Sequence, residues 1–362
     1  MKTRSILMTT LCSLMLGMGF TSCLNDEDEP NILPIEPETY PAYILNEGAM
    51  GAKNANITSF VPNYKAENLS DVYLKMNNQK MGDVANAMIE EDENIYVVLH
   101  GSKYVARLDM TIKEQARYTF PEAEGAPRCI DVEDGYAYVT QYGGQVSKLN
   151  IKDMTLAGTF KGGDNLEGIV EKDGKLYVAN SYKSVYEYNK EVYVIDAKTM
   201  ALEKTIEVVE NPTKLFEIDD KIYLISAGNY LDVPGALQVI DTKTGTPKHI
   251  INDVNKITEG DNGLIYGVRS TYDTTWQLTN SFFIYNPNSG DFNEASFLQD
   301  APSSFSTAAI YLLEVDEKNG FIYVGITDYI TNGTIYQFDK SGKFIKSFDS
   351  GGINPSAMVF GY

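Results

Sequence analysis

A short motif recurs along the 362-residue chain, in which an acidic or glycine-containing turn precedes a strand with the pattern hydrophobic–Tyr–hydrophobic. From Tyr96 onward, the tyrosines of successive copies lie 42, 39, 46, 43 and 57 residues apart. A period of ~40–50 residues in a chain dominated by strand patterns is typical of a β-propeller, whose blades are consecutive four-stranded sheets. The six clear copies are centred on Tyr96, Tyr138, Tyr177, Tyr223, Tyr266 and Tyr323, and a weaker seventh is centred on Tyr43.

Residues 127–160 illustrate the order of strands within one repeat. Asp134-Gly135 is a hairpin turn that separates a first strand from the Tyr strand. A Gly-rich loop and a second turn then separate two further strands, so the repeat predicts four short antiparallel strands. The same order fits residues 88–120, 168–208, 213–251, 256–297 and 309–348.

The two ends of the repeat region complement each other. Residues 355–360 have the pattern of a first strand with no blade after it, and residues 42–46 that of a second strand with no first strand before it. Pairing them would close the ring and leave no long exposed edge strand. The sequence therefore predicts an all-β, seven-bladed β-propeller with four antiparallel strands per blade and a first blade closed by both termini. An open β-solenoid or a two-sheet sandwich is the alternative.

The N-terminal region predicts export and anchoring. Residues 1–22 combine Lys2 and Arg4 with an apolar run that is too short to span a bilayer, as in a signal peptide. Cys23 follows a small residue, as in a bacterial lipobox, and is the expected lipidation site; ordinary secretion with an incidental cysteine is the alternative. Residues 23–41 form an acidic tether with several prolines, and residues 42–362 form the propeller.

Composition argues against several classes of function. The formal net charge of −20 disfavours nucleic-acid binding through phosphate neutralisation. Only two histidines occur, His100 and His249, and no pair stands at metal-ligand spacing, so we expect no metal site and no catalytic triad. We therefore expect a protein that is not an enzyme, although carboxylates from different blades could still meet at the axis, as in propeller glycosidases.

The loops that follow the Tyr strands predict a binding face. In a propeller these loops share a face with the connections between blades, and here they are long, notably residues 180–190 and 269–280, and hold aromatic residues together with amides or hydroxyls. Binding sites combine aromatic anchors with a few polar groups. The candidate ligand-binding residues are Asn46, Glu47, His100, Lys103, Tyr104, Tyr142, Asn180, Tyr182, Asn229, Tyr230, Arg269, Tyr272, Trp276, Asp328 and Tyr329.

Two sets of motifs carry a family resemblance. Residues 192–196 (Val-Tyr-Val-Ile-Asp) and 237–241 (Leu-Gln-Val-Ile-Asp) resemble the strands of YVTN-type propellers. The opening Tyr-Ile-Leu-Asn-Glu-Gly of residues 43–48 and the Ala-Asn-Ala-Met of residues 85–88 resemble a lipoprotein branch found in Bacteroidota, in particular the BtuG family. The acidic run after Cys23 also resembles the export signal of surface lipoproteins in that phylum; a mere spacer is the alternative.

The resemblance implies a function. BtuG proteins are lipoproteins on the outer face of the outer membrane that capture cobalamin and pass it to a TonB-dependent transporter. Cobalamin is a large, flat molecule with many amides, which a face rich in Tyr and Asn could bind from several blades. The resemblance implies no cofactor other than this ligand. A protein- or matrix-binding propeller and a propeller lyase or glycosidase remain the alternatives.

Overall fold

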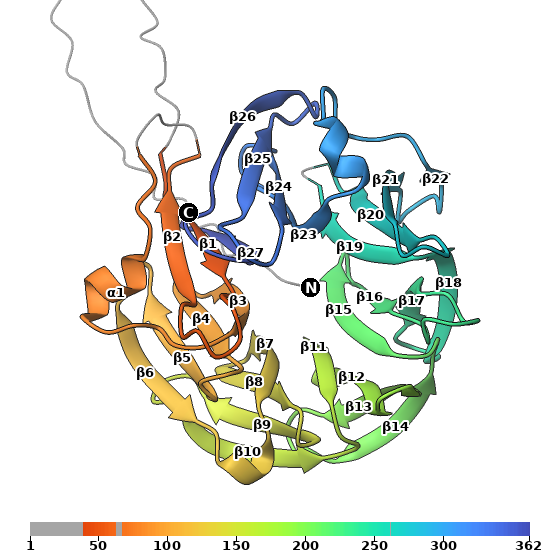
Figure 1. Cartoon of the computed structure of the whole chain (residues 1–362). Coiled ribbons are helices and arrows are strands. Elements are labelled where there is room, and N and C mark those ends of the chain that lie inside the picture. The colour runs from red at the N-terminus through yellow and green to blue at the C-terminus, as the bar shows by residue number, and fades with distance from the viewer. Residues whose placement is uncertain (1–38, 63–66, 261) are drawn as a thin grey trace, which may run out of the picture. The chain divides into compact units, whose positions relative to one another are not determined.

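Seven antiparallel sheets surround a central axis in the computed structural model, which describes residues 39–62, 67–260 and 262–362. We number the sheets as blades 1–7 in chain order. In blades 2–7, Figure 1 shows the first strand next to the axis and the last strand at the circumference. Within the described residues, six sheets have four strands and blade 1 has three. The predicted all-β, seven-bladed propeller is confirmed.

The strands follow one another outward in blades 2–7. Blade 2 contains β3 (Ala85–Glu91), β4 (Asn94–Leu99), β5 (Tyr104–Asp109) and β6 (Glu114–Thr119). Blade 3 contains β7 (Pro127–Glu133), β8 (Tyr136–Gln141), β9 (Gln145–Asn150) and β10 (Thr155–Lys161). Blade 4 contains β11 (Leu166–Lys172), β12 (Lys175–Ser184), β13 (Glu187–Asp196) and β14 (Leu202–Glu207). Blade 5 contains β15 (Pro212–Ile218), β16 (Lys221–Ser226), β17 (Ala236–Asp241) and β18 (Thr246–Asn252).

The remaining blades have the same order. Blade 6 contains β19 (Val254–Glu259), β20 (Ile265–Tyr272), β21 (Leu278–Tyr285) and the short β22 (Phe292–Asn293). Blade 7 contains β23 (Ala309–Val315), β24 (Ile322–Thr327), β25 (Thr334–Phe338) and β26 (Phe344–Asp349). Three short helices lie outside the sheets: α1 (Val72–Asn77), η1 (Glu122–Glu124) and η2 (Ser303–Ser306). None of the described helices is long and apolar enough to span a membrane.

Blade 1 is built from both ends of the chain, as expected. The strand β1 (Ala42–Asn46) lies between β2 (Asn56–Phe60) and β27 (Pro355–Phe360), and it is antiparallel to both. Instead of a fourth strand, backbone hydrogen bonds between Ser59 and Leu69 in both directions line the outer edge. The closure of the ring is therefore a hydrogen-bonded ladder between the two ends of the propeller.

The first hairpin of several blades depends on its acidic turn. Asp134 and Gly135 have φ angles of 51° and 79°, and Asp173 and Gly174 have φ angles of 52° and 78°. Two consecutive positive φ angles define the type I′ turn, which matches the right-handed twist of a two-residue hairpin and favours Asp-Gly. The turn residues seen in the sequence thus fix the register of the Tyr strands.

The core lies between blades rather than within one. One cluster combines Tyr138 and Val146 of blade 3 with Leu166 and Leu176 of blade 4. Each blade therefore buries both of its faces, as its strands with few charges predict. The seven repeated tyrosines belong to this core, since none is more than 6% exposed.

The signal peptide (residues 1–22) and Cys23 lie outside the described residues, as does all of the tether (residues 23–41) except residues 39–41. Residues 40–362 form one compact unit. The chain enters this unit at Tyr40, whose ring lies edge-on to that of Tyr362 with centroids 5.0 Å apart. β1 begins and β27 ends at this point. Tyr40 and Tyr362 therefore lie on the face opposite the loops that follow the Tyr strands.

Candidate functional site

A β-bulge interrupts the innermost strand of every blade near its first residue. In blade 5 the ladder passes from Pro212 to Lys214 while the partner strand advances by one residue, so Thr213 is the extra residue. The same shift occurs in the other six blades. A bulged residue leaves the ladder and its side chain is re-aimed. The bulges hold Asn86, Arg128, Glu167, Thr213, Asn255, Tyr311 and Ser356, and all seven residues line one pocket.

In several blades, the residue immediately before the inner strand has a left-handed backbone conformation. Asn165, Asn211, Asp253 and Asn354 each precede an inner strand and have φ angles between 58° and 62°. Asn and Asp tolerate this left-handed conformation better than other residues with side chains. They turn the chain into the strand immediately before its bulge. An Asn or Asp two positions before the bulged residue therefore marks the mouth of the central channel in the sequence.

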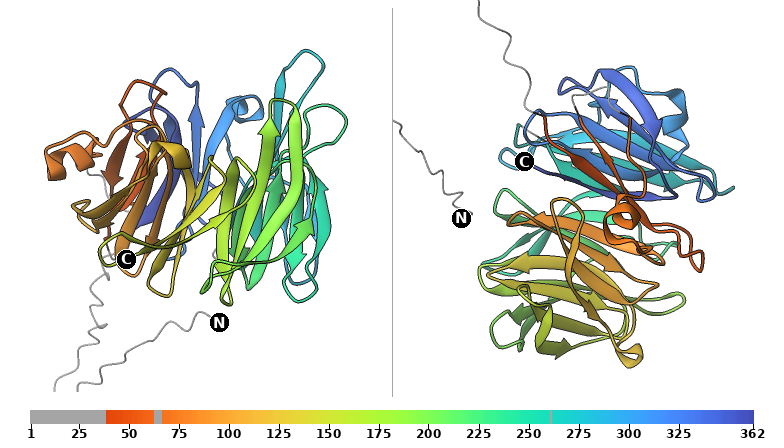
Figure 2. Two further views of the ribbon diagram at one scale, coloured as in Figure 1. Left: turned by 90° about the horizontal axis from the view of Figure 1, so that it is seen from below. Right: turned by 90° about the vertical axis from the view of Figure 1, so that its left-hand side faces the viewer.

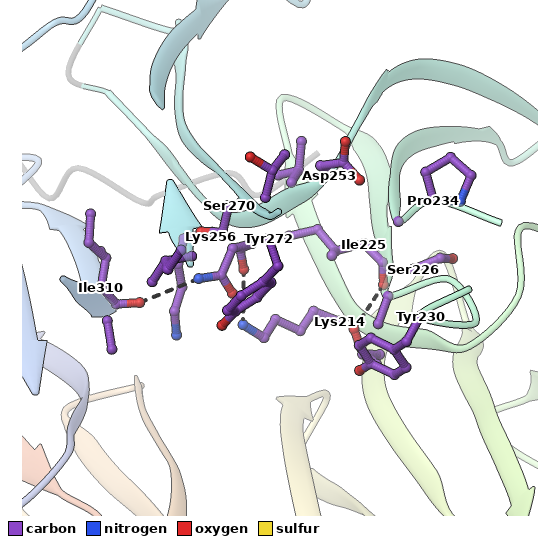
Figure 3. Close-up of a pocket in the computed structure, with 18 of the residues that line it drawn as sticks. Lys214, Ile225, Ser226, Tyr230, Pro234, Asp253, Lys256, Ser270, Tyr272 and Ile310 are labelled. Carbon is purple, nitrogen blue, oxygen red and sulfur yellow. Dashed lines mark hydrogen bonds between the residues drawn. The ribbon is translucent and has the colours of Figure 1, made fainter. Parts of the chain in front are cut away.

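The pocket, which we call the funnel, is the wide mouth of this channel on the face of the loops that follow the Tyr strands. Its volume is about 1170 Å³. The bulged residues form its floor, and the β16–β17 and β20–β21 connections form its highest wall. Figure 3 shows Lys214 and Lys256 entering it from neighbouring inner strands, with Tyr230 and Tyr272 nearby. A smaller cavity of about 300 Å³ shares Glu167, Thr213 and Tyr230 with the funnel and extends below the β12–β13 hairpin.

One side of the funnel floor is an ion pair held by a tyrosine. The Nε and Nη2 atoms of Arg128 donate to the Glu167 carboxylate at 3.1 and 3.2 Å. The hydroxyl of Tyr142 donates to the same carboxylate at 2.6 Å, and the Arg128 guanidinium lies 4.7 Å from the centroid of the Tyr142 ring. Bidentate pairs are the strongest ion-pair geometry in proteins. Glu167 therefore accepts three hydrogen bonds from protein donors.

The opposite side of the floor has a second acidic group. Glu47 accepts hydrogen bonds from the hydroxyl of Tyr311 and from Nδ2 of Asn86, the latter at 3.5 Å. Burial raises the pKa of Glu47, while the Tyr311 hydrogen bond and the charges of Arg128 and Lys256 oppose this change. Among the described residues, no group of three or more Asp, Glu, His or Cys side chains is arranged to bind a metal ion.

Aromatic residues at the loop tips surround the funnel. Tyr186, Tyr230, Trp276 and Tyr329 lie at the tips of four consecutive blades, 4 to 7, and all have φ angles between 59° and 65°. A left-handed backbone is unfavourable for a bulky residue, and such strain persists where the surroundings impose it, often at ligand sites. Trp276 is nevertheless 73% exposed, with its ring 6.2 Å from that of Tyr272. The rim thus presents large aromatic surfaces to solvent in strained positions.

The structure brings six of the fifteen candidate residues to these cavities. They are Glu47, Tyr182, Tyr230, Tyr272, Trp276 and Tyr329. Two further candidates lie behind the floor: Tyr142 supports the ion pair, and the ring of His100 lies edge-on to Tyr142 at 5.2 Å. Burial and the Arg128 charge lower the pKa of His100.

The other seven candidates have local structural partners. Asn46, Tyr104 and Asn180 are buried, and the Tyr104 hydroxyl donates to the carbonyl of Met81 at 2.6 Å. Lys103 pairs with Glu122, and Arg269 with Glu294. Asn229 and Asp328 accept backbone N–H groups of their own loops. The structure therefore places these seven residues outside the two cavities.

Two of the expected long loops are mostly strand. β12 continues to Ser184 and β13 resumes at Glu187, and β20 and β21 likewise extend to Tyr272 and from Leu278. Cross-strand pairs such as Tyr182 with Tyr188 continue the ladder beyond the sheet body. Alternating Tyr and polar residues suit a strand as well as a loop, which is why the sequence did not separate the two. Figure 2 shows these hairpins projecting from one face of the ring.

Sequence reasoning missed the floor of the funnel. Arg128, Glu167, Lys214, Lys256 and Tyr311 lie at the start of inner strands, which the loop argument ignored. Their common position, one or two residues into the first strand of each repeat, was the signal that could have found them.

The stability of the folded protein is expected to depend on the protonation of Glu314 in β23. Burial raises its pKa to about 7, although Thr258 Oγ1 donates to it at 3.3 Å. Because the folded protein holds this proton at pH values where the unfolded chain has lost it, the stability contributed by Glu314 falls as pH rises from 4.5 to about 7. We expect Glu314→Gln to match the wild type near pH 4.5 and to exceed it by up to about 3 kcal/mol at pH 8.

Urea unfolding at several pH values measures this difference. Glu207→Gln, at an exposed position of the outer strand β14, is the control for the substitution itself and should give only a small difference. A constant difference between Glu314→Gln and the wild type from pH 4.5 to 8 would contradict the assignment.

Comparison with known proteins gives a family and confirms the fold. A family model described as a domain of unknown function, DUF5074, matches residues 40–229, which is 190 of 362 residues. The chain belongs to the DUF5074 family. The DUF5074 match covers β1 and β2 of blade 1, blades 2–4 and the first half of blade 5, so it includes the Arg128–Glu167 side of the funnel. A comparison with curated proteins found no match.

Solved structures similar to this DUF5074 chain have diverse functions. They include Kuenenia stuttgartiensis hydrazine synthase (17% identity, 68% of this chain and 74% of that chain, TM-score 0.55) and a streptogramin B lyase (14%, 73% and 82%, 0.53). A third is the computationally designed Ika8 protein (14%, 86% and 88%, 0.55). At these identities the similarity shows the propeller fold alone, because one fold supports unrelated chemistries.

Proposed function

We propose that this protein captures a large ligand in the funnel without chemical conversion, and that the ligand is cobalamin or a related corrinoid. The observation that carries the proposal is the funnel itself. Pockets for drug-sized molecules measure ~300–1,000 Å³, whereas the volume of this one is about 1170 Å³. Its size favours a ligand larger than an ordinary metabolite.

The chemistry of the funnel suits a flat molecule with many amides. Asn86, Thr213, Asn255 and Ser356 line the floor and supply neutral donors and acceptors from four blades. The rim aromatics supply apolar contact area at low entropic cost, since Tyr and Trp have few rotatable bonds. A rigid ring of blades also reduces the ordering cost of binding. The resemblance to the BtuG family supplies the identity of the ligand.

The topology suits capture at a cell surface. The chain enters the propeller at Tyr40 on the face opposite the funnel, so attachment through Cys23 would leave the funnel face free for a ligand and a partner. We propose an outer-membrane lipoprotein of this kind, exposed to the exterior, that passes its ligand to a TonB-dependent transporter. Exposed apolar residues at the loop tips suit such a protein partner: Met50, Val185, Leu231 and Ile330 are each at least 78% exposed. Such side chains are enriched at protein interfaces when they gather on one face.

Gel filtration after incubation with cyanocobalamin tests the proposal. We expect the protein peak to emerge coloured and free ligand to be depleted in proportion. A colourless protein peak at micromolar protein and ligand would reject corrinoid capture.

The strained Trp276 offers a variant that separates binding from folding. Asn accepts the left-handed backbone at this position better than Trp does, so Trp276→Asn should leave the free energy of unfolding unchanged or slightly raised. Loss of a rim anchor typically costs about 1.4–2.8 kcal/mol of binding, which is a ~10–100-fold weaker Kd for cyanocobalamin. Calorimetric titration measures the Kd and urea unfolding the stability.

Leu156→Ala is the matched control for Trp276→Asn. Leu156 is a partly exposed apolar residue of the outer strand β10, away from the funnel. We expect its Kd to equal that of the wild type. Equal affinities for Trp276→Asn and Leu156→Ala would show that the rim does not contact the ligand.

A further inference from the structure

Two lysines meet in the funnel floor. Lys214 is the third residue of β15 and Lys256 the third residue of β19, so each follows the bulged residue of its blade. Figure 3 shows both side chains entering the middle of the pocket. The Lys214 Nζ donates to the backbone carbonyl of Asn255 at 3.2 Å, and the two lysines are close enough for the charge of Lys214 to lower the pKa of Lys256. Two basic groups therefore share one small region.

Neither lysine is in an ion pair with any residue of the described ranges. By contrast Lys172, Lys175 and Lys190 each have a carboxylate within 3.0 Å. The arrangement is unusual for a chain with a net charge of −20, in which carboxylates outnumber cations by 50 to 30. An overall shortage of acidic residues therefore does not explain why both lysines lack an ion pair.

The two nearest carboxylates of the floor have other partners. Glu167 is occupied by Arg128 and Tyr142, and Glu47 by Tyr311 and Asn86. The Lys256 Nζ lies 5.2 Å from the centroid of the Tyr311 ring. The protein thus supplies a π face and a carbonyl to this pair, while Glu167 acts on Lys214, and Glu47 and Glu314 act on Lys256, through their charges without forming an ion pair.

Placing two ammonium groups together is electrostatically unfavourable. Burial lowers the pKa of Lys214, and burial together with the charge of Lys214 lowers the pKa of Lys256. An anion placed between the two nitrogens would reverse the repulsion and form charge-assisted hydrogen bonds to both. The cavity leaves this position open to the ligand, because both lysines line it.

We propose that Lys214 and Lys256 form a subsite for an oxyanion, a phosphoryl or carboxylate group carried by the captured ligand. The subsite deepens the proposed function by naming a charged group that the ligand must present, and its test does not require a corrinoid. Arg128, on the same floor, adds positive potential without direct contact. The remaining floor residues are neutral or are carboxylates already bound by the protein, so the anion has one preferred position.

Titration of the full chain with inorganic phosphate tests the subsite. We expect phosphate to bind saturably, and more tightly than chloride at matched ionic strength. Calorimetry and the melting temperature of the protein measure this binding. A parallel titration with acetate distinguishes the two sources of the oxyanion: tighter phosphate binding assigns a phosphoryl group, and tighter acetate binding a carboxylate. If neither anion binds above the chloride reference, the subsite is rejected.

Lysine variants locate the binding. Lys214→Met and Lys256→Met keep the length of the side chain and remove its charge. Each should therefore weaken the affinity for the preferred anion at least ~10-fold. Lys248→Met, at an exposed position of β18, should leave this affinity unchanged. Both variants should melt at or above the wild-type temperature, because each removes the repulsion. An unchanged anion affinity in the double variant would overturn the proposal.

The two proposals fail separately. Phosphate or acetate binding that depends on the lysines, together with a colourless peak in the cyanocobalamin experiment, retains the subsite and rejects the corrinoid. A coloured peak without any anion binding retains corrinoid capture and rejects the subsite.

Discussion

Removing residues 355–362 is expected to abolish cooperative folding of the propeller. These residues include all of β27, which pairs with β1 over its whole length from Ala42 with Phe360 to Asn46 with Pro355. Without it, blade 1 would have two strands, and the inner edge of β1 would be left unpaired. The ring would then have a gap at the point where blades 1 and 7 meet.

The apolar side chains that β27 buries determine how large this effect is. Met358, Val359 and Phe360 are each less than 10% exposed. Full burial of such side chains contributes about 1.5–3 kcal/mol each, which sums to roughly 5–9 kcal/mol. The net stability of a folded protein is about 5–15 kcal/mol. Loss of one strand therefore removes most or all of the stability of the whole ring.

Soluble yield and thermal unfolding measured by circular dichroism check this prediction. Deletion of Tyr362 alone is the control, because this residue is almost half exposed and lies beyond the strand. The control should melt cooperatively within a few degrees of the wild type. A truncated chain that melts with a sharp transition close to the wild-type temperature would show that the ring does not need its closing ladder.

Glu167→Gln is expected to lower the free energy of unfolding by about 2–4 kcal/mol. The substitution keeps the shape of the side chain but removes the charge that balances Arg128, whose guanidinium would remain partly buried in the funnel floor. Breaking a buried pair by neutralising one partner typically costs 3–5 kcal/mol, and we expect somewhat less because the Arg128 and Glu167 side chains retain 21% and 11% exposure. The Tyr142 hydroxyl would also lose a charged acceptor.

Glu122→Gln provides the matched comparison. Glu122 pairs with Lys103 at 2.5 Å, but its side chain is 88% exposed. Exposed pairs contribute 0–1 kcal/mol, so the same chemical change should have a small effect there. Urea unfolding of both variants measures the two losses in free energy of unfolding. Equal losses would show that the funnel floor does not strengthen the Arg128–Glu167 pair.

The architecture could be predicted from the sequence because it depends on repetition. The Tyr strands recur at a nearly fixed spacing, and turns such as Asp134-Gly135 mark each hairpin, so local and global patterns agree. The closure of blade 1 followed from the complementary patterns of residues 42–46 and 355–360. Strand ends were less predictable: β12 and β20 continue beyond their expected limits, because alternating aromatic and polar residues fit both a strand and a loop.

The candidate site could be predicted only in its upper part. Rim residues such as Trp276 and Tyr230 were predicted because the sequence places aromatic residues in the loops that follow the Tyr strands. Floor residues such as Lys256 were missed because a bulge shifts one residue out of the ladder, and a one-residue shift reverses which side chain faces the channel. Residues such as Asn180 have polar side chains typical of sites, but their partners come from the neighbouring strand, which sequence order alone does not reveal.

The ring of bulges has a consequence for how this architecture diversifies. A bulged residue makes no ladder hydrogen bond, so its replacement does not disturb the strand pairing that holds the blade together. Apart from the paired Arg128 and Glu167, the floor positions can therefore change identity one at a time while the ring persists. Proteins with this same backbone can hold ligands of different size and charge, and membership of one family does not by itself imply a shared ligand. Comparing the seven floor residues, rather than whole sequences, should sort family members by what they bind.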